Sequence, residues 1–264
     1  MNLLIGDIGN TITKLSVVDK NKLIIKKIVY FPSIEINSKK ILKRNFYKLL
    51  KNTSINSTAL FSIVVPKYKY KLKKYKLKKF LKKNYKIFLK EIKDKDINKI
   101  IKINLKNKKQ VGSDRIANSV GAYKKYKTNC IILDFGTATT FDVVTKKGFY
   151  NGGLIAPGIN LSIKSLATFA DQLPIFSLKK PKKVIGKNTM EALRSGFYWG
   201  YSGLINNIIS KITKKTNKKY KIIFTGGYAS LFKASIATPF TIDKNITIKG
   251  ITEIYKHNFN NFNK

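Results

Sequence analysis

Two short segments of the sequence each place an aspartate, a glycine and a hydroxyl-bearing turn directly after an apolar run. Residues 3–18 read LLIGDIGNTITKLSVV and residues 130–144 read CIILDFGTATTFDVV, with Asp7 and Asp134 at corresponding positions. A glycine turn lets backbone N–H groups and hydroxyls approach a phosphate chain closely. The aspartate can hold a metal ion that bridges phosphate oxygens, directly or through water. The two segments therefore predict phosphate binding.

A single segment of this kind is also an ordinary β-hairpin, because Asp-Ile-Gly-Asn and Asp-Phe-Gly-Thr are common turn sequences. Two copies in corresponding halves favour the binding hypothesis, and Thr225-Gly226-Gly227 adds a third glycine turn. The pattern indicates a nucleotide held by one phosphate loop from each half, with the Gly226–Gly227 turn against the nucleoside.

A third acidic residue, Asp114, stands at the start of an expected helix. It follows Gly112-Ser113 and precedes RIANSVGAYKKY. The local sequence predicts a helix cap, because a carboxylate there accepts N–H bonds from the first turn. A cap also keeps a carboxylate rigid and ionised, which a general base requires. The same helix start, together with the Arg115 guanidinium, offers donors to a carboxylate or hydroxyl of a substrate.

The charge of the chain is extreme, with a formal net value of +41. Only three of the 54 basic residues are arginines: Arg44, Arg115 and Arg194. Base readers usually favour arginine, and the lysines here are scattered over all parts of the chain. Drift toward AT-rich codons explains this profile, so no specific nucleic-acid partner is expected. A regulatory protein that binds nucleic acid or another partner stays as the alternative function.

The remaining composition is that of a globular protein with 43% hydrophobic residues. No apolar run approaches the roughly 20 residues that cross a bilayer, so no membrane association is expected. The amino terminus shows no secretory signal, and Cys130 is the only cysteine. We therefore expect a cytoplasmic protein without disulfides.

Hydrophobic patterning predicts an α/β protein in which strands and helices mix in both halves. Residues 148–158 are expected to form a glycine-rich turn region, and residues 220–231 a strand, a glycine pair and a helix start. The other predicted strands cover residues 2–8, 12–18, 22–30 and 59–66 and the repeat at 130–144. The predicted helices cover residues 38–50, 70–84, 113–126 and 188–215 (one helix or a broken pair), with a final helix around His257.

Several motifs occur in one order along the chain. They are DIGNT (Asp7–Thr11), SIVVP (Ser62–Pro66), VGSDR (Val111–Arg115), DFGTATT (Asp134–Thr140), NGGLIAPGINLS (Asn151–Ser162), QLP (Gln172–Pro174), GKNTMEALRSG (Gly186–Gly196) and GITEIYKHN (Gly250–Asn258). Each motif alone is weak, but the ordered set resembles the type III pantothenate kinase family from end to end.

The resemblance implies an α/β fold of two duplicated ribonuclease-H-like halves, of the type found in actin and sugar kinases, with an ATP cleft between them. The expected halves are residues 1–110 and residues 111–264, the second carrying a homodimer interface. The implied reaction is ATP-dependent phosphorylation of pantothenate to 4'-phosphopantothenate, the first step of coenzyme A biosynthesis. The implied cofactors are ATP, Mg²⁺ and a monovalent cation, potassium or ammonium.

The resemblance also implies roles for individual residues. Asp114 is the expected catalytic base, and Asp7 also positions Mg²⁺, while Asp134 belongs to the monovalent-cation site. The residues expected at the substrate are Gly112, Ser113, Asp114, Arg115 and, across the dimer interface, Thr189. The residues expected at ATP are Asp7, Ile8, Gly9, Asn10, Thr11, Ile12, Thr13, Lys14 and Thr137.

The chain departs from the family pattern just before the VGSDR motif. Family members commonly carry a substrate-contacting tyrosine where this chain has Leu105, and an Asn-Pro where it has Asn107-Lys108. The departure at Leu105 leaves room for a kinase of the same fold that acts on another alcohol.

Overall fold

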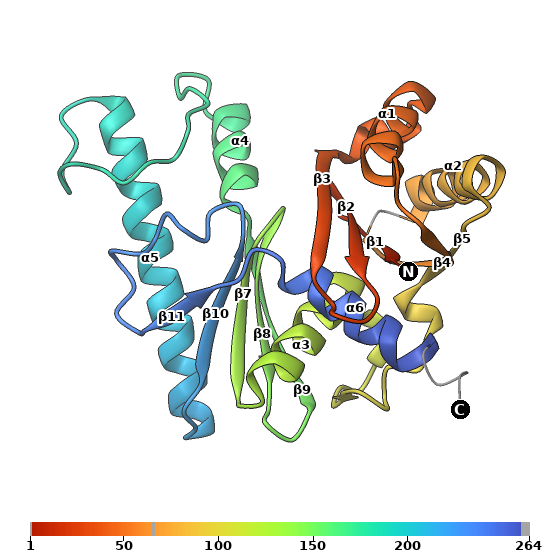
Figure 1. The fold of residues 1–264 in the computed structure, drawn as a ribbon. Coiled ribbons are helices and arrows are strands. Elements are labelled where there is room, and N and C mark those ends of the chain that lie inside the picture. Colours follow the sequence, from red (N-terminus) through yellow and green to blue (C-terminus); the bar gives the residue numbers. More distant parts are fainter. Residues whose placement is uncertain (1, 65–66, 260–264) are drawn as a thin grey trace. The chain divides into compact units, whose positions relative to one another are not determined.

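The computed structural model of the chain describes residues 2–64 and 67–259, and it gives side-chain burial for these residues outside 67–75. By their internal contacts the described residues form two compact units, which Figure 1 shows as ribbons. Unit 1 contains residues 2–125 and 245–259, and unit 2 contains residues 126–244.

The elements of unit 1 are β1 (Asn2–Ile8), β2 (Ile12–Asp19), β3 (Ile25–Pro32), the 3-10 helix η1 (Ser33–Asn37), α1 (Lys39–Leu50), β4 (Ile55–Ile63), α2 (Lys67–Tyr85), β5 (Phe88–Glu91), the 3-10 helix η2 (Ile92–Asp94), β6 (Lys102–Ile103), the 3-10 helix η3 (Lys108–Gln110), α3 (Ser113–Tyr126, whose last residue is counted in unit 2) and α6 (Ile246–Phe259). The elements of unit 2 are β7 (Cys130–Phe135), β8 (Ala138–Val144), β9 (Phe149–Pro157), α4 (Ile159–Phe169), α5 (Thr189–Thr216), β10 (Lys221–Gly226) and β11 (Phe240–Ile242).

The sheet of unit 1 has the strand order β3-β2-β1-β4-β5. The first three strands pair antiparallel, and β4 and β5 add as parallel strands. Because side chains alternate along a strand, Leu4 and Ile8 of β1 enter the core that also contains residues of α1 and α2. Asp7 therefore projects from the other face of the sheet. The last helix, α6, contacts β1 and β4 (Figure 1).

The strands of unit 2 repeat this arrangement. Their order is β11-β10-β7-β8-β9, in which β7, β8 and β9 pair antiparallel and β10 and β11 add as parallel strands. A core of apolar side chains from β7, β8 and β10 packs with α4 and α5. The predicted α/β fold with a duplicated ribonuclease-H-like arrangement is thus confirmed, because these five strands have the same order and directions as the five strands of the unit 1 sheet.

Most predicted elements are confirmed. The serine expected to cap the helix at 38–50 does so, because Ser38 Oγ accepts a hydrogen bond from the Ile41 N–H at 3.4 Å. β4 begins at Ile55 instead of residue 59, and the predicted end of this strand at residues 65–66 lies outside the described residues. The segment at 188–215 is a single helix, α5.

Two predictions about glycine-rich segments are wrong. The region 148–158 was expected to form turns, but β9 occupies most of it, because pairing with β8 outweighs the low strand propensity of glycine. A helix was expected to start at the end of the segment 220–231, yet residues 227–235 form consecutive turns. In these turns Leu231 N–H donates to Tyr228 O at 3.0 Å, and Ser235 N–H donates to Phe232 O at 3.1 Å.

Unit 1 includes two helices, α3 and α6, that follow the strands of its sheet along the sequence. Asn118 of α3 and Thr247 of α6 are both buried, and the Thr247 hydroxyl donates to Asn118 Oδ1 at 2.7 Å. The helices also cross at Gly250, which leaves no room for a Cβ against the carbonyl of Ala117. The division into halves at residues 110 and 111 stays a prediction, and the contact units differ from it by joining residues 111–125 and 245–259 to unit 1.

Candidate functional site

The first acidic turn lies at the carboxyl end of β1. Asp7 is the penultimate residue of this strand, opposite Lys14 on β2 and opposite Ser62 on the parallel strand β4. The Lys14 Nζ lies 4.0 Å from Asp7 Oδ2. The Gly9 N–H closes the turn by donating to the Ile12 carbonyl at 3.1 Å. The turn thus places a carboxylate and an ammonium group side by side, next to exposed backbone.

The residues predicted to bind ATP in this turn divide into two sets. Asn10, Thr11 and Ile12 are exposed, and Gly9 and Lys14 are half-buried. Ile8 and Thr13 are buried. The side chain of Ile8 belongs to the hydrophobic core, and the hydroxyls of Thr13 and Ser33 hydrogen-bond at 2.9 Å. Because the side chains of Ile8 and Thr13 point inward, contacts of these two residues with ATP would come from their backbone, and their place at ATP stays a prediction.

The candidate base, Asp114, lies in the first turn of α3 and is half-buried. Its Oδ1 accepts a hydrogen bond from the Arg115 N–H at 2.8 Å. A Cβ on Gly112 would lie only 2.5 Å from the same oxygen, so the carboxylate occupies the space that a side chain at 112 would need. Gly112 is required for this position of the Asp114 carboxylate, whether or not its backbone also contacts a ligand.

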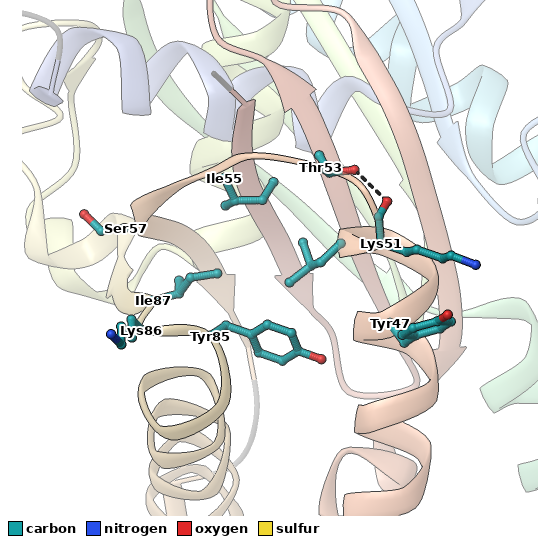
Figure 2. A pocket seen from close by; sticks show the side chains of 9 residues that line it. Tyr47, Lys51, Thr53, Ile55, Ser57, Tyr85, Lys86 and Ile87 are labelled. Atoms are coloured by element: carbon teal, nitrogen blue, oxygen red, sulfur yellow. Dashed lines mark hydrogen bonds between the residues drawn. The ribbon is translucent and has the colours of Figure 1, made fainter.

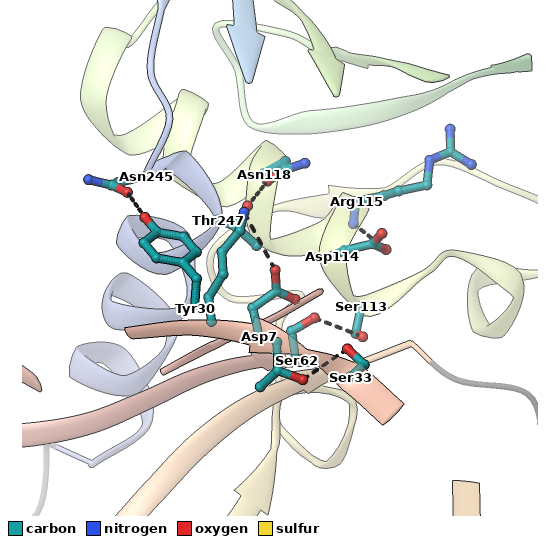
Figure 3. Close-up of polar contacts among 12 residues, drawn as sticks. Asp7, Tyr30, Ser33, Ser62, Ser113, Asp114, Arg115, Asn118, Asn245 and Thr247 are labelled. Atoms are coloured by element: carbon teal, nitrogen blue, oxygen red, sulfur yellow. Dashed lines mark hydrogen bonds and ion pairs between the residues drawn. The ribbon is translucent and has the colours of Figure 1, made fainter. Parts of the chain in front are cut away.

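Ser113 fixes the start of α3 to the end of β4. The Ser113 hydroxyl donates to the Ile63 carbonyl and accepts from the Ile63 N–H and the Ser62 hydroxyl, each at 3.1 Å. Both serines are buried. Since Ser62 is also the register partner of Asp7, these contacts bring Asp114 to the same end of the sheet as Asp7 (Figure 3). The role of Ser62 escaped sequence reasoning, although this serine begins the SIVVP motif and interrupts the apolar run ALFSIVV.

The second acidic turn, in unit 2, follows the corresponding strand but is one residue shorter, because residues 136–138 separate the pair Phe135 and Thr139 where residues 9–12 separate Ile8 and Thr13. Asp134 is the penultimate residue of β7, with Thr140 opposite on β8 and Thr225 opposite on the parallel strand β10. The Gly136 N–H donates to the Ala138 carbonyl at 3.1 Å. Thr137, predicted to bind phosphate, is exposed at the tip of this turn.

The glycine turn after β10 packs directly on this second turn. Gly226 has a φ of +86°, and a Cβ there would lie 2.6 Å from the backbone of Phe135. The Gly227 N–H donates to the Phe135 carbonyl at 3.1 Å. Only glycine combines that φ with such a close approach, so the sequence feature expected to contact a nucleoside borders the second turn.

Thr189 begins α5 and is exposed, and its neighbour Asn188 caps the helix by accepting from the Glu191 N–H at 2.9 Å. Thr189 lines a cavity of about 650 Å³ in unit 2. The other lining residues are mostly apolar or glycine: Pro157, Ser162, Leu173, Ala192, Leu193, Gly196, Phe197, Gly200, Tyr201 and Leu204.

A second cavity, of about 490 Å³, lies in unit 1 near the start of β4 (Figure 2). It is lined by Tyr47, Leu50, Lys51, Thr53, Ile55, Ser57, Tyr85, Lys86 and Ile87. None of the predicted site residues is among them. Ser62, which borders Asp7, lies at the opposite end of β4.

Within residues 2–64 and 67–259, no three histidine, cysteine or acidic side chains gather as a metal site. Mg²⁺ needs no such cluster when it binds together with a phosphate chain, because one or two carboxylates then suffice and the phosphates supply the other oxygens. Asp7 is placed to be such a carboxylate. Among the same residues, no helix is long and apolar enough to span a membrane.

The duplicated sheets define the class of protein to which the chain belongs. The structure of EutJ, an ethanolamine utilization protein from Carboxydothermus hydrogenoformans, matches 96% of this chain and 89% of its own, with a TM-score of 0.58 and 14% identity. The ROK hexokinase from Thermus thermophilus matches 96% of this chain and 97% of its own, with a TM-score of 0.50 and 10% identity. The fold is that of the actin-like sugar kinases.

Sequence comparison identifies the family. The profile of the type III pantothenate kinase family matches residues 3–211. The type III pantothenate kinase of Pelagibacter ubique is 49% identical over 94% of this chain and 96% of its own, and that of Citrifermentans bemidjiense is 34% identical over 97% and 99%. The chain belongs to the type III pantothenate kinase family.

Proposed function

We propose that this protein transfers the terminal phosphoryl group of ATP to the primary hydroxyl of pantothenate. The product is 4'-phosphopantothenate, and the reaction is the first step of coenzyme A biosynthesis. The family membership supports this activity. The structural observation that carries it is the placement of Asp114 at the same end of the unit 1 sheet as the Asp7 turn. We assign the reaction to the cytoplasm, where ATP is present.

A neutral alcohol is a weak nucleophile, so its proton must be accepted as the hydroxyl oxygen bonds to phosphorus. Asp114 is the proposed acceptor of this proton. The bond between the terminal phosphorus and its bridging oxygen breaks, and ADP leaves with the electron pair. The hydrogen bond from the Arg115 N–H holds the carboxylate in place.

The proposed phosphate contacts come from both acidic turns. In unit 1 they are the side chains of Asn10, Thr11 and Lys14 and the backbone of the turn around Gly9. In unit 2 the contact is Thr137, at the exposed tip of its turn. The Lys14 ammonium supplies positive charge against the phosphates.

Two cations complete the proposed chemistry. Asp7 would hold Mg²⁺, directly or through water, and Mg²⁺ supplies charge neutralisation of the phosphates when bound. Asp134 would hold potassium or ammonium. The register partners of Asp134 are the hydroxyl residues Thr140 and Thr225, and oxygen atoms are the ligands such ions prefer.

We propose that pantothenate contacts Gly112, Asp114 and Arg115 of one protomer and, across the dimer interface, Thr189 of the other. Arg115 suits the pantothenate carboxylate, because its planar donors match a carboxylate fork. Leu105 supplies no hydroxyl where the family commonly has a tyrosine, so we expect a raised KM for pantothenate and unchanged chemistry at the hydroxyl.

We propose a homodimer formed through unit 2. Large apolar side chains are exposed at β9, α4 and α5 and in the segment between these helices: Leu154, Ile155, Leu161, Phe169, Ile175, Val184, Ile185 and Trp199. Such an accumulation is typical of an interaction surface.

A substitution at Gly200 tests the proposed interface, because a Cβ there meets nothing within 4 Å and a side chain can be added without harming the fold. Gly200→Glu should give a folded monomer by light scattering, whereas Lys211→Glu, at the far end of the same helix, should stay dimeric. Two dimeric variants would contradict this interface.

The test of function is a kinase assay with ATP, Mg²⁺ and pantothenate, with and without potassium. Wild-type protein should form phosphopantothenate. Asp114→Asn should lower kcat by about 10³-fold, because general-base catalysis contributes about 10²–10⁴-fold, while ATP binding measured by calorimetry stays unchanged. No product from the wild-type protein with either salt would overturn the proposal, and transfer to other alcohols in a panel would redirect it.

A further inference from the structure

We infer that Ser113 is a positioning residue that, together with Ser62, holds the base Asp114 in register with the phosphate-binding strand β1. The inference rests on the proposed function. It differs from the sequence-based expectation, in which Ser113 contacts the substrate. We call the hydrogen-bonded pair of hydroxyls of Ser62 and Ser113 the serine latch.

The hydrogen-bonding capacity of Ser113 is fully used inside the protein. A serine hydroxyl has one donor and two acceptor positions. The donor is directed to the Ile63 carbonyl, and the two acceptor positions take the Ile63 N–H and the Ser62 hydroxyl, all at 3.1 Å. Ser113 is 2% exposed. Its side chain therefore has neither the access nor a remaining hydrogen-bond position for a substrate hydroxyl.

The partners of Ser113 lie where a displacement would matter. Ile63 is the last residue of β4, and Ser62 is paired in parallel register with Asp7 on β1. Asp114 follows Ser113 directly, so any rotation or shift of the first turn of α3 moves its carboxylate. Figure 3 shows the latch beneath Asp114 and next to Asp7. The latch thus sets the distance between the proton acceptor and the strand that carries the phosphate turn.

Another contact of α3 lies further along the helix, where the Thr247 hydroxyl of α6 donates to Asn118 Oδ1 at 2.7 Å. Asn118 is one helical turn beyond Asp114, so this contact fixes the helix axis, whereas the latch fixes the first turn. Loss of the latch should consequently disturb the geometry of the base more than the stability of the unit.

The test compares Ser113→Ala, Ser62→Ala and the double variant in the full-length protein. Ser113→Ala should lower kcat for pantothenate phosphorylation by about tenfold to a hundredfold, because a displacement near 1 Å costs about 10² in rate. KM for ATP and for pantothenate should stay within about twofold, since neither hydroxyl binds them. The double variant should be no slower than Ser113→Ala, because the two hydroxyls act as one unit.

The chain offers matched controls. Ser119 on α3 and Ser16 on β2 are fully buried serines whose hydroxyls have no hydrogen-bond partner among the described residues. Ser119→Ala and Ser16→Ala should keep wild-type kcat. Ser113→Thr retains the hydroxyl and should recover most of the activity lost in Ser113→Ala, with melting temperatures measured for every variant. In Ser113→Ala the plateau of the pH–kcat profile should fall without a shift of its acid limb.

The outcomes separate this inference from the proposed function. A raised KM for pantothenate in Ser113→Ala, with Ser62→Ala behaving like Ser16→Ala, would overturn the latch and restore Ser113 as a substrate contact. Equal kcat values in Ser113→Ala and Ser119→Ala would also overturn it while leaving the kinase activity intact. A wild-type protein inactive toward pantothenate would overturn both.

Discussion

The two acidic turns occupy corresponding positions in their sheets but differ in length by one residue and in their surroundings. Each places an aspartate next to the end of its first strand, and each is closed by a glycine N–H that donates at 3.1 Å to a carbonyl at the start of the next strand. Asp7 has Lys14 opposite on one side, whereas the corresponding partner of Asp134 is Thr140. On the parallel side Asp7 has Ser62 and Asp134 has Thr225.

The difference shows how a duplicated scaffold can divide two tasks. The first turn carries an ammonium group, and through Ser62 it is connected to the helix that bears Asp114. The first turn therefore suits the binding of negatively charged phosphates and the positioning of the base for phosphoryl transfer. In the second turn the strand partners of the aspartate are the hydroxyl residues Thr140 and Thr225, which add oxygen atoms beside its carboxylate. That environment favours a small cation.

We expect the largest effects when the carboxylate charges of Asp7 and Asp134 are removed one at a time. Asp7→Asn should lower kcat/KM for ATP by about 10²–10³-fold and shift the Mg²⁺ dependence. Asp134→Asn should cost about tenfold and abolish the activation by potassium. Initial rates over Mg²⁺ and potassium titrations at constant ionic strength measure both.

Asp19→Asn is the matched control for these two variants. Hydrogen bonds from the Lys22 backbone and the Lys26 ammonium hold the pKa of the Asp19 carboxyl well below its usual range, and the residue lies at the far end of β2. Its loss should leave both cation responses as in the wild type. If Asp7→Asn and Asp134→Asn respond alike to the two cations, the division of tasks is wrong.

An exchange of the flanking residues should produce a smaller effect. Lys14→Thr makes the first turn resemble the second, and it should raise KM for ATP about tenfold through the loss of one ammonium–phosphate contact. Thr140→Lys should place an ammonium group beside Asp134 and replace the monovalent cation, so that the activity no longer depends on potassium.

Thr140→Val controls for the shape of the Thr140 variant without adding charge. It should keep its response to potassium, although it loses the contact of 3.5 Å from the Thr140 hydroxyl to Asp142. A Thr140→Lys protein that unfolds at the wild-type temperature and still requires potassium would contradict the assignment of Asp134.

The smallest expected effect concerns protein stability, and its cysteine probe reports on unit 2 but not on unit 1. Burial raises the pKa of the Cys130 thiol on β7 to about 12, so the thiol stays protonated at neutral pH and should resist Ellman's reagent in the native protein. Because the unfolded thiol ionises near pH 8.5, the contribution of this group to stability should decline as the pH rises from there. Labelling in increasing urea should follow the opening of unit 2, since unit 1 has no cysteine. Rapid labelling in the absence of urea would contradict the burial.

Much of this organisation could be predicted from the sequence. The aspartate–glycine turns, the capped start of α1 and the helix that begins around Asp114 depend on contacts between residues close in the chain, and such contacts leave local patterns. The order of motifs was sufficient to indicate the family. The strand β9 and the turns after β10 were missed because glycine-rich sequence is ambiguous until a neighbouring strand or turn fixes its conformation.

The sequence by itself determined which groups are available: two acidic turns, one candidate base and one basic residue beside the first turn. Only the tertiary structure decided which of them meet. Ser62 and Ser113 are 51 residues apart, yet their hydroxyls hydrogen-bond because parallel pairing of β1 and β4 and the docking of α3 bring them together. The side chains of Ile8 and Thr13 belong to the segment expected to bind ATP, yet Ile8 turns into the core and Thr13 into a buried hydrogen bond. The physical reason is that side-chain direction and long-range pairing depend on sheet register, which no short segment encodes alone.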